Sequence, residues 1–398
     1  MKRTIVTLPG DGIGEIVLRS ALKVLDAVGF DAEYINGDIG WEFWKKEGNP
    51  LPERTIELIE KHKIVLFGAI TSKPKEEAAN ELADELKNKN LVYFSPIVGL
   101  RQHFNLDICL RPCRTYQGNP LNFVRRSADA NKIDEPLVNV VVFRQNTEGL
   151  YGGVEWSNPD DKVYEALMTH PKFVKNFSHV PKSDLSISTR IFTKRATERI
   201  LLAAFEYARQ YGYKSVTLAE KPNVIRETSG MMYKMAKEIQ REHFSDIELW
   251  NTNIDAQMMW LTKNPEDYGV IVAGNMFGDI VSDAFAGLIG GLGFACSAQY
   301  NPDNGVAVFE PTHGSAPKYA EYEKSIVNPI AMIETSCMML DHIGENDLAK
   351  KIRDAIAKVI KEGKVRTYDM MKLKGSPEVF EHGAASTDEM TEAIIANL

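Results

Sequence analysis

Two aspartates stand four residues apart in the stretch GNMFGDIVSD, residues 274–283. If this stretch is helical, the carboxylates of Asp279 and Asp283 lie on one face, one turn apart. Like charges at that spacing repel, so water or a cation must offset the cost. A cation held only by oxygen atoms would be Mg²⁺ or Mn²⁺ rather than zinc.

The same pair also has a purely structural explanation. A helix here would have an apolar face opposite the aspartates, formed by Ile280, Val281, Ala284, Phe285 and Leu288. A polar face turned to water fits this pattern, and so do carboxylates near a helix N-terminus, where the macrodipole favours them. Periodicity therefore leaves the solvated face and the metal site both open.

Three arginines are candidates for binding an anion. Arg101 and Arg111 flank the stretch RQHFNLDICLR, and Arg144 directly follows the apolar run NVVVF. Arginine pairs with carboxylates through two parallel hydrogen bonds. Arg144 stands at a strand end, where open α/β sheets bind their ligands. From these stretches alone, surface arginines and an anion site are about equally well supported.

Two further side chains have proton-transfer chemistry. Lys221 ends the apolar run SVTLAE, and Tyr151 stands between glycines in EGLYGG. A lysine at a strand end can act as a base when burial lowers its pKa, and a tyrosine can donate a proton. A solvated lysine in a turn and a packed tyrosine are the commoner situations, and the local sequence does not exclude them.

The glycines of LPGDGIGEIV lie between an expected strand and an expected helix. Gly10, Gly12 and Gly14 do not have the spacing of the dinucleotide fingerprint, whose third glycine comes one residue later. The pattern argues against an ordinary Rossmann enzyme. A tight turn and a cofactor contact both fit it.

Strands and helices alternate along the chain, which predicts an α/β fold with a largely parallel sheet. The run LVNVVVF is continuously apolar, as in a sheet covered on both faces. Residues 193–212 predict a helix that begins at Thr193 and stops at Gly212. Residues 227–244 predict another, with Met231, Met235 and Ile239 on its core face. Residues 152–192 show little helical period, so we expect a long loop or a small β excursion there.

Composition limits the class of protein. The 398 residues are 44% hydrophobic and 26% charged, with a net charge of −8. This predicts a large core split into two domains, and the acidic balance argues against nucleic acid as a partner. We expect no membrane segment, no signal peptide and a cytoplasmic location. The four cysteines are expected to be buried thiols, not a disulfide framework or a zinc site: Cys109, Cys113, Cys296 and Cys337.

Taken together, these stretches resemble the isocitrate/3-isopropylmalate dehydrogenase family of β-decarboxylating dehydrogenases. The similarity covers nearly the whole chain and rests on six motifs in the family's order: LPGDGIG, LRQHFNLDICLRP, FRQNTEGLYGG, EKPNV, NMFGDIVSDAFAGLIGGLG and FEPTHGSAPKYA. Two stretches, ICLRPCRTYQGNP and GVEW, look most like bacterial NADP-dependent isocitrate dehydrogenases.

The resemblance implies the family's fold, which is not a Rossmann fold but two α/β domains and a β clasp. The large domain would be residues 1–105 and 291–398, and the small one residues 106–148 and 194–290. Residues 149–193 would be the clasp that joins two subunits. The resemblance thus implies a homodimer with shared active sites.

The resemblance also implies roles for individual residues. Asp279 and Asp283 would hold one Mg²⁺ or Mn²⁺ together with Asp255 of the other subunit. Lys221, which also reaches into the other subunit's site, would assist deprotonation of the substrate hydroxyl, and Tyr151 would protonate the enolate carbon. The substrate would be bound by Ser95, Arg101, Arg111, Arg144 and Asn223.

The implied hydride acceptor is NADP, with NAD as the alternative. Lys318 and Tyr319 stand where NAD-using relatives commonly have Asp and Ile, and a lysine can pair with the 2′-phosphate. Lys372 stands where bacterial NADP enzymes often have arginine. The complete set of cofactor residues implied is His313, Gly314, Lys318, Tyr319, Asn328, Tyr368 and Lys372.

The implied reaction is oxidative decarboxylation of isocitrate to 2-oxoglutarate, but one position departs from that pattern. Ser95 matches the family's serine that meets the distal carboxylate, whereas Ile97 replaces the asparagine. An apolar residue there is closer to relatives that take homoisocitrate or 3-isopropylmalate, so both stay alternatives. A non-catalytic regulatory homologue is a remote one. Ser95 is also a candidate phosphorylation site, in a context altered by Pro96.

Overall fold

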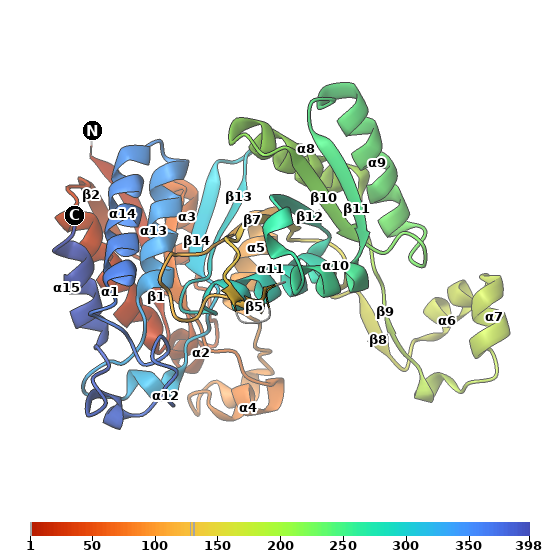
Figure 1. Cartoon of the computed structure of the whole chain (residues 1–398). Helices are drawn as coiled ribbons and strands as arrows, with labels where there is room; N and C mark the ends of the chain where they lie inside the picture. The colour runs from red at the N-terminus through yellow and green to blue at the C-terminus, as the bar shows by residue number, and fades with distance from the viewer. Residues whose placement is uncertain (1, 128, 130–131) are drawn as a thin grey trace.

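The computed structural model describes residues 2–127, 129 and 132–398. Within them, ten strands form one sheet in the order β11-β10-β12-β7-β4-β13-β14-β3-β1-β2 (Figure 1). The strands are β1 (Arg3–Gly10), β2 (Ala32–Asn36), β3 (Ile64–Ala69), β4 (Ile108–Arg114), β7 (Asn139–Gln145), β10 (Ser215–Glu220), β11 (Glu248–Asn253), β12 (Val270–Ala273), β13 (Cys296–Asn301) and β14 (Val306–Pro311).

The sheet has two parallel ends and an antiparallel centre. The strands β11, β10, β12 and β7 are parallel to one another, as are β14, β3, β1 and β2. The central pairs β7–β4, β4–β13 and β13–β14 are antiparallel. The prediction of a largely parallel sheet therefore holds for both ends and misses the centre, where strands from distant parts of the chain meet.

Helices cover both ends of this sheet. At one end lie α1 (Ile13–Ala27), α13 (Ile330–His342), α14 (Asn346–Glu362) and α15 (Thr387–Ile395), with both chain termini nearby (Figure 1). At the other end α8 (Lys194–Gln210) and α9 (Thr228–His243) pack on a core that includes β7, β10 and β12. The remaining α-helices near the sheet are α2 (Trp41–Glu47), α3 (Glu53–His62), α4 (Lys75–Asn80), α5 (Pro96–His103), α10 (Ile254–Leu261), α11 (Asn275–Ile289) and α12 (Pro317–Ala320).

The helix at 193–212 forms as predicted. Thr193 is its N-cap, because the side-chain oxygen of Thr193 accepts a hydrogen bond from the backbone of Ala196. The chain leaves the helix at Gly212, which has φ +73°, a conformation that glycine adopts without strain.

Two predicted helix faces are confirmed in part. On α9, Ile239 is buried as predicted, but Met231 and Met235 are only half-buried, and the other apolar side chains buried there are Met232 and Ala236. On α11, Val281, Phe285 and Leu288 are buried as predicted, whereas Ile280 is 45% exposed. Both helices carry apolar residues on more than one side, so the 3.6-residue period alone does not fix which side is buried.

The segment expected to lack helices contains two. A short antiparallel pair, β8 (Glu155–Ser157) and β9 (Ser186–Ser188), extends from the body of the protein. It carries α6 (Asp161–Met168) and α7 (Pro171–Phe177) at its tip (Figure 1). The β excursion was expected, but these helices are too short to show a clear sequence period. We call residues 149–193 the arm.

The prediction for the cysteines is confirmed, because all four are free and buried. Among the described residues no helix combines the length and the apolar character that crossing a bilayer requires. A second small sheet, β5 (Arg125–Arg126) with β6 (Ile133–Asp134), completes the strands.

Candidate active site

Asp279 and Asp283 lie on one face of α11, and a buried arginine bridges them. The guanidinium nitrogen Nη1 of Arg111, on β4, lies 3.0 Å from Oδ1 of Asp279 and 3.1 Å from Oδ1 of Asp283. It also donates to Ser282 Oγ at 2.9 Å. Burial raises the pKa of Asp283, an effect that the positive charge of Arg111 opposes and the negative charge of Asp279 adds to. The aspartates lie beyond the first turn of α11, so the helix N-terminus does not explain them.

Arg144 joins the same cluster from β7. Its Nη1 donates to Asp279, and its Nε donates to Asn275 Oδ1 at 2.9 Å. Burial lowers the pKa of Arg144 to about 10, and the positive charges of Arg111 and Arg101 act in the same direction. Three cations this close favour an anionic ligand, because each guanidinium raises the cost of burying the others.

Tyr151 lies at the rim of the cluster. It belongs to the short 3₁₀ turn Leu150–Gly152 at the start of the arm, and the guanidinium carbon of Arg144 lies 5.7 Å from its ring centre. The tyrosine is 47% exposed. Partial burial raises the pKa of Tyr151, and the charge of Asp279 raises it further. The phenol is therefore held in its protonated form, as a proton donor must be.

Arg101 reaches the site from α5. Its Nε donates to Gln299 Oε1 at 2.5 Å, and its Nη2 lies 3.1 Å from Glu310 Oε1. Gln299 also accepts from Asn146 Nδ2 at 2.8 Å, which ties this group to the end of β7. The position of Arg101 is thus fixed by polar side chains of β13 and β14.

Ser95 and Ile97 open the helix that carries Arg101. Ser95 is the N-cap residue of α5, but its side chain makes no capping hydrogen bond. Its hydroxyl is therefore not used by the helix. Ile97 is half-buried and packs against the apolar cluster beneath α5.

Lys221 and Asp255 form a pair of their own. Lys221 Nζ donates to Asp255 Oδ1, and this bond lowers the pKa of Asp255. Glu220, just before Lys221, is fully buried and lies 2.9 Å from Arg190 Nη2. Glu220 Oε1 also accepts from the backbone of Gly274, where α11 begins. The backbone before Lys221 is thus tied to the helix of the aspartates. Asn223 is exposed on the following turn.

The aspartates fit a divalent metal in part. Within the described residues no group of three or more His, Cys, Asp or Glu side chains is arranged to hold an ion. One chain offers two carboxylates, Asp279 and Asp283, while Asp255 pairs with Lys221. Two carboxylates are a sufficient protein share for Mg²⁺, which keeps water or substrate oxygens as its other ligands.

The glycine turn after β1 packs against the loop 313–318, far away in the sequence. The backbone of Ile13 donates to Ser315 O at 2.8 Å, and a Cβ on Gly12 would lie 2.2 Å from that oxygen. Gly12 also has φ +56°. Both the lack of space for a Cβ and this backbone conformation therefore require glycine at this position. The turn shapes the neighbouring loop, so its role goes beyond reversing the chain.

The loop 313–318 carries groups suited to a nucleotide. His313 Nδ1 lies 3.0 Å from Gly314 O, whereas its Nε2 is buried without a partner among the described residues. Burial lowers the pKa of His313, which favours the neutral ring. A Cβ on Gly314 would meet no heavy atom within 4 Å, so open space lies beside this glycine. A neutral imidazole with an unpaired nitrogen, next in sequence to a glycine with open space beside it, is compatible with a heterocyclic ligand at this loop.

Lys318, Tyr319 and Tyr368 lie together. The Tyr319 and Tyr368 ring centres are 5.8 Å apart, and Lys318 Nζ lies 6.0 Å from the Tyr319 ring. Lys318 is exposed, and so is Lys372, four residues after Tyr368. This arrangement presents a cation and two phenols, which are groups that bind a phosphate.

Asn328 differs from the other proposed cofactor residues because its side chain is already used. Its Nδ2 donates to Asp369 Oδ2 at 3.0 Å, and its Oδ1 accepts from the backbone of Ile330 at 3.0 Å. Asn328 therefore anchors the segment that carries Tyr368.

Sequence reasoning overlooked three polar residues that hold this site in shape. Glu310 and Gln299 orient Arg101, and Asn275 orients Arg144. All three are buried. Glu310 and Asn275 stand inside the family motifs, where a polar residue at the end of an apolar run was the available signal.

The chain belongs to the isocitrate/isopropylmalate dehydrogenase family, whose model matches residues 4–394. It is 41% identical over 393 residues to Protein DlpA of Legionella pneumophila, covering 98% of this chain but only 58% of that protein. It is 38% identical over 352 residues to the homoisocitrate dehydrogenase of Methanocaldococcus jannaschii, covering 88% of each.

A solved structure agrees with these relatives. The isocitrate dehydrogenase from Methylococcus capsulatus matches 99% of both chains with a TM-score of 0.80 and 34% identity. The predicted family and fold are therefore confirmed, and the chain is an oxidoreductase of the β-decarboxylating dehydrogenase class. Members of this family generally use NAD(P) and a divalent metal, bind a hydroxy acid and are usually dimers.

Proposed function

We propose that this protein oxidises isocitrate to 2-oxoglutarate and CO₂, with NADP as hydride acceptor and Mg²⁺ or Mn²⁺ as metal. The observation that carries the proposal is the convergence of Arg111, Arg144 and Tyr151 on Asp279. These groups come from β4, β7 and the arm, and together they bind carboxylates, hold a cation and supply a proton.

In the proposed reaction the chain's own residues bind, orient and move protons. Arg101, Arg111 and Arg144 bind carboxylates of the substrate. For Arg111 and Arg144 these replace the aspartate partners, so no buried arginine is left unpaired, while Gln299 and Glu310 keep Arg101 in position. Lys221 takes part in removing the hydroxyl proton, and Tyr151 returns a proton to the carbon that loses CO₂. The metal, when bound to Asp279 and Asp283, lowers the hydroxyl pKa and stabilises negative charge on the adjacent oxygen.

The proposal needs two chains. Following the family resemblance, we assign Lys221 and Asp255 to the site of a second subunit; within one chain they pair with each other and not with Asp279. The arm supports this assignment, because it exposes apolar side chains that a partner would cover: Val154, Val174, Phe177 and Ile191.

A second substrate is favoured by one specific observation. Ile97, on the helix of Arg101 and Ser95, gives an apolar surface where a distal carboxylate of isocitrate would otherwise find an amide. Homoisocitrate and 3-isopropylmalate, with NAD, are therefore the alternatives. The similarity to a homoisocitrate dehydrogenase supports the first of them.

The decisive experiment is a turnover panel. Each of the three hydroxy acids is assayed with NADP and with NAD in the presence of Mg²⁺. Isocitrate with NADP should give the highest kcat/KM. A higher value for either other acid would replace the substrate assignment. No turnover in any of the six combinations, from folded dimer, would favour the non-catalytic regulatory homologue.

A further inference from the structure

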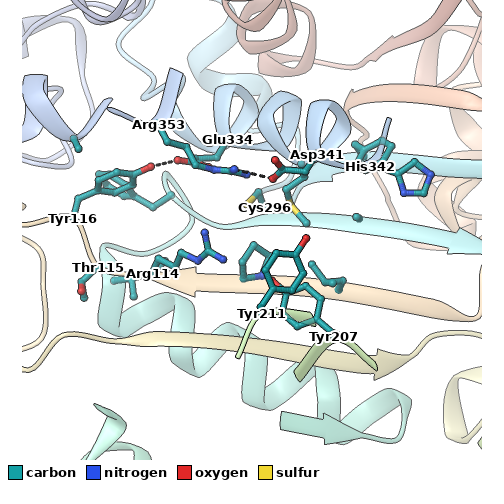
Figure 2. A pocket seen from close by; sticks show the side chains of 18 of the residues that line it. Arg114, Thr115, Tyr116, Tyr207, Tyr211, Cys296, Glu334, Asp341, His342 and Arg353 are labelled. Carbon is teal, nitrogen blue, oxygen red and sulfur yellow. Dashed lines mark hydrogen bonds and ion pairs between the residues drawn. The ribbon is translucent and has the colours of Figure 1, made fainter. Parts of the chain in front are cut away.

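A cavity of about 510 Å³ lies on the opposite face of the sheet from Arg111. Figure 2 shows side chains that line this cavity. Side chains alternate along a strand, so Arg111 and Cys113 of β4 face α11, while Leu110, Pro112 and Arg114 face this cavity. On β13 the same alternation turns Gln299 toward Arg101 and Ala298 toward the cavity. We call this cavity the back pocket.

The back pocket lies between the two halves of the sheet. Its walls are α8 on one side and α13 with α14 on the other, and its floor is the antiparallel junction of β4 and β13. Tyr207 of α8 and Tyr211, the residue directly after α8, face it from one side, and Met338 and His342 face it from α13. Its volume is in the range of small-molecule sites.

The back pocket is lined by the basic Arg114 and Arg353 and by the acidic Glu334, Asp341 and Asp354, of which Asp354 pairs with Lys350 at 2.5 Å. Arg353 is neutralised, since its Nε lies 3.2 Å from Glu334 Oε2 and its Nη1 lies 2.7 Å from Asp341 Oδ2. Glu334 also accepts from the Tyr116 hydroxyl. These bonds are drawn in Figure 2.

Arg114, across the cavity from that group, has no such partner. Its side chain makes no hydrogen bond or ion pair with any described residue, and it is exposed to solvent. Burial and the positive charge of Arg353 act to lower the pKa of Arg114, but Tyr207, Tyr213 and Glu334 act to raise it, and its pKa lies above the usual value. A guanidinium without an ion-pair partner among the described residues, in a partly apolar hollow, favours an anion with a planar pair of oxygens.

The apolar part of the lining indicates what the rest of the ligand must be, apart from its charged group. Phe294, Phe309, Met338 and Leu110 offer no hydrogen bond, and the rings of Tyr207 and Tyr211 offer flat faces. We propose that the back pocket binds a small organic carboxylate with an apolar or aromatic body, whose carboxylate pairs with Arg114. The ligand would contact both halves of the sheet and the strand that carries Arg111.

Calorimetric titration of the full chain with 4-phenylbutyrate tests this proposal without any activity assay. We expect saturable binding of one molecule per chain. 4-Phenyl-1-butanol, which has the same body and no charge, should bind at least about tenfold more weakly, and acetate, which has the charge and no body, should not bind measurably.

Two variants locate the site. Arg114→Gln should weaken phenylbutyrate about tenfold and leave the alcohol unchanged, while Arg19→Gln, which removes an exposed arginine of α1, should change neither. Ala357→Phe, on α14, should block both ligands by filling the cavity. If phenylbutyrate does not bind, the proposal is wrong. It is also wrong if phenylbutyrate binds equally well to the parent, to Arg114→Gln and to Ala357→Phe, because the acid would then lie elsewhere, for example on Arg101 and Arg144.

Discussion

A single nitrogen of Arg111 bridges Asp279 and Asp283, at 3.0 and 3.1 Å. The repulsion between two carboxylates one helical turn apart is thus offset within the chain by a buried cation. A metal at this pair would take over part of that role, and Arg111 would become free to bind a carboxylate of the substrate. The same residues then have two sets of partners: they pair with one another in the free protein, and with the metal and the substrate when these are bound.

The proposed metal site makes a direct prediction. Asp279→Asn should lower turnover at least about a hundredfold, because a carboxylate ligand and several kcal/mol of charge stabilisation are lost. Circular dichroism should show an intact fold. Asp26→Asn, an exposed position on α1, is the matched control and should keep full activity. Full activity of the parent protein in excess chelator would remove the metal assignment.

Shared active sites predict complementation between inactive chains. Tyr151→Phe and Lys221→Met should each be inactive as homodimers. After subunit exchange, a heterodimer would contain one site with both native residues, so activity should return to as much as about half of that of the parent dimer per heterodimer. The measurement is turnover in mixtures whose heterodimer content is verified by mass. Heterodimers without activity would count against sites built from two chains.

The class of fold could be predicted well from the sequence, whereas the buried faces of the helices could be predicted only in part. Continuous apolar runs such as NVVVF predict buried strands because a sheet covered on both faces tolerates nothing else. Ile280 was misplaced because α11 has apolar residues on two sides, and a single chain leaves one of them exposed. The short helices of the arm gave too few residues for a period to appear.

The contacts within the candidate site could not be predicted from local sequence patterns. Arg111 and Asp279 are 168 residues apart, and Arg101 and Gln299 are 198 apart. No spacing rule connects such residues. Only the resemblance to a family brought Arg111 and Asp279 into one site before the structure did, and Gln299 was not predicted at all. The back pocket has no sequence signal at all, since its lining comes from strands and helices distant along the chain.

The close approach of the glycine turn predicts an effect on cofactor binding. Gly12→Ala would place a methyl group 2.2 Å from the backbone oxygen of Ser315, in a residue with φ +56°. The loop 313–318 must then move, so KM for the cofactor should rise more than kcat falls, and stability should drop by about 1–3 kcal/mol. Gly29→Ala is the matched control, because Gly29 has φ +87° but no atom nearby. Equal KM values in both variants would show that the turn does not position the loop.

Asp107 predicts a pH dependence of stability. Burial raises its pKa from 3.8 to about 6, although Arg199 lies 3.1 Å away and opposes the shift; Asp303 adds to it. The unfolded chain therefore loses this proton first, so the contribution of Asp107 is most favourable below about pH 4 and is lost as the pH rises to about 6.

The test compares urea unfolding of the parent and Asp107→Asn at pH 4 and pH 7.5. The stability of the variant relative to the parent should improve by about 2–3 kcal/mol between these values, at about 1.36 kcal/mol per pKa unit. A difference that stays constant with pH would show that Asp107 is ionised normally in the folded protein.

Cofactor choice gives the last prediction. Lys318 supplies a charge and Tyr319 a hydroxyl at the rim of the loop 313–318, where the 2′-phosphate of NADP is proposed to bind. A charge-assisted pair with phosphate contributes about 1.5–3 kcal/mol, or about ten- to a hundredfold in relative efficiency. Lys318→Asp with Tyr319→Ile should reduce or reverse a preference for NADP, mainly through KM, because the new carboxylate repels the phosphate while the attraction is lost. Lys374→Asp, at an exposed lysine outside the proposed cofactor set, is the charge-matched control and should leave the NADP to NAD ratio of kcat/KM unchanged. A parent enzyme that prefers NAD, or a ratio that the double substitution does not move, would show that these two residues do not read the phosphate.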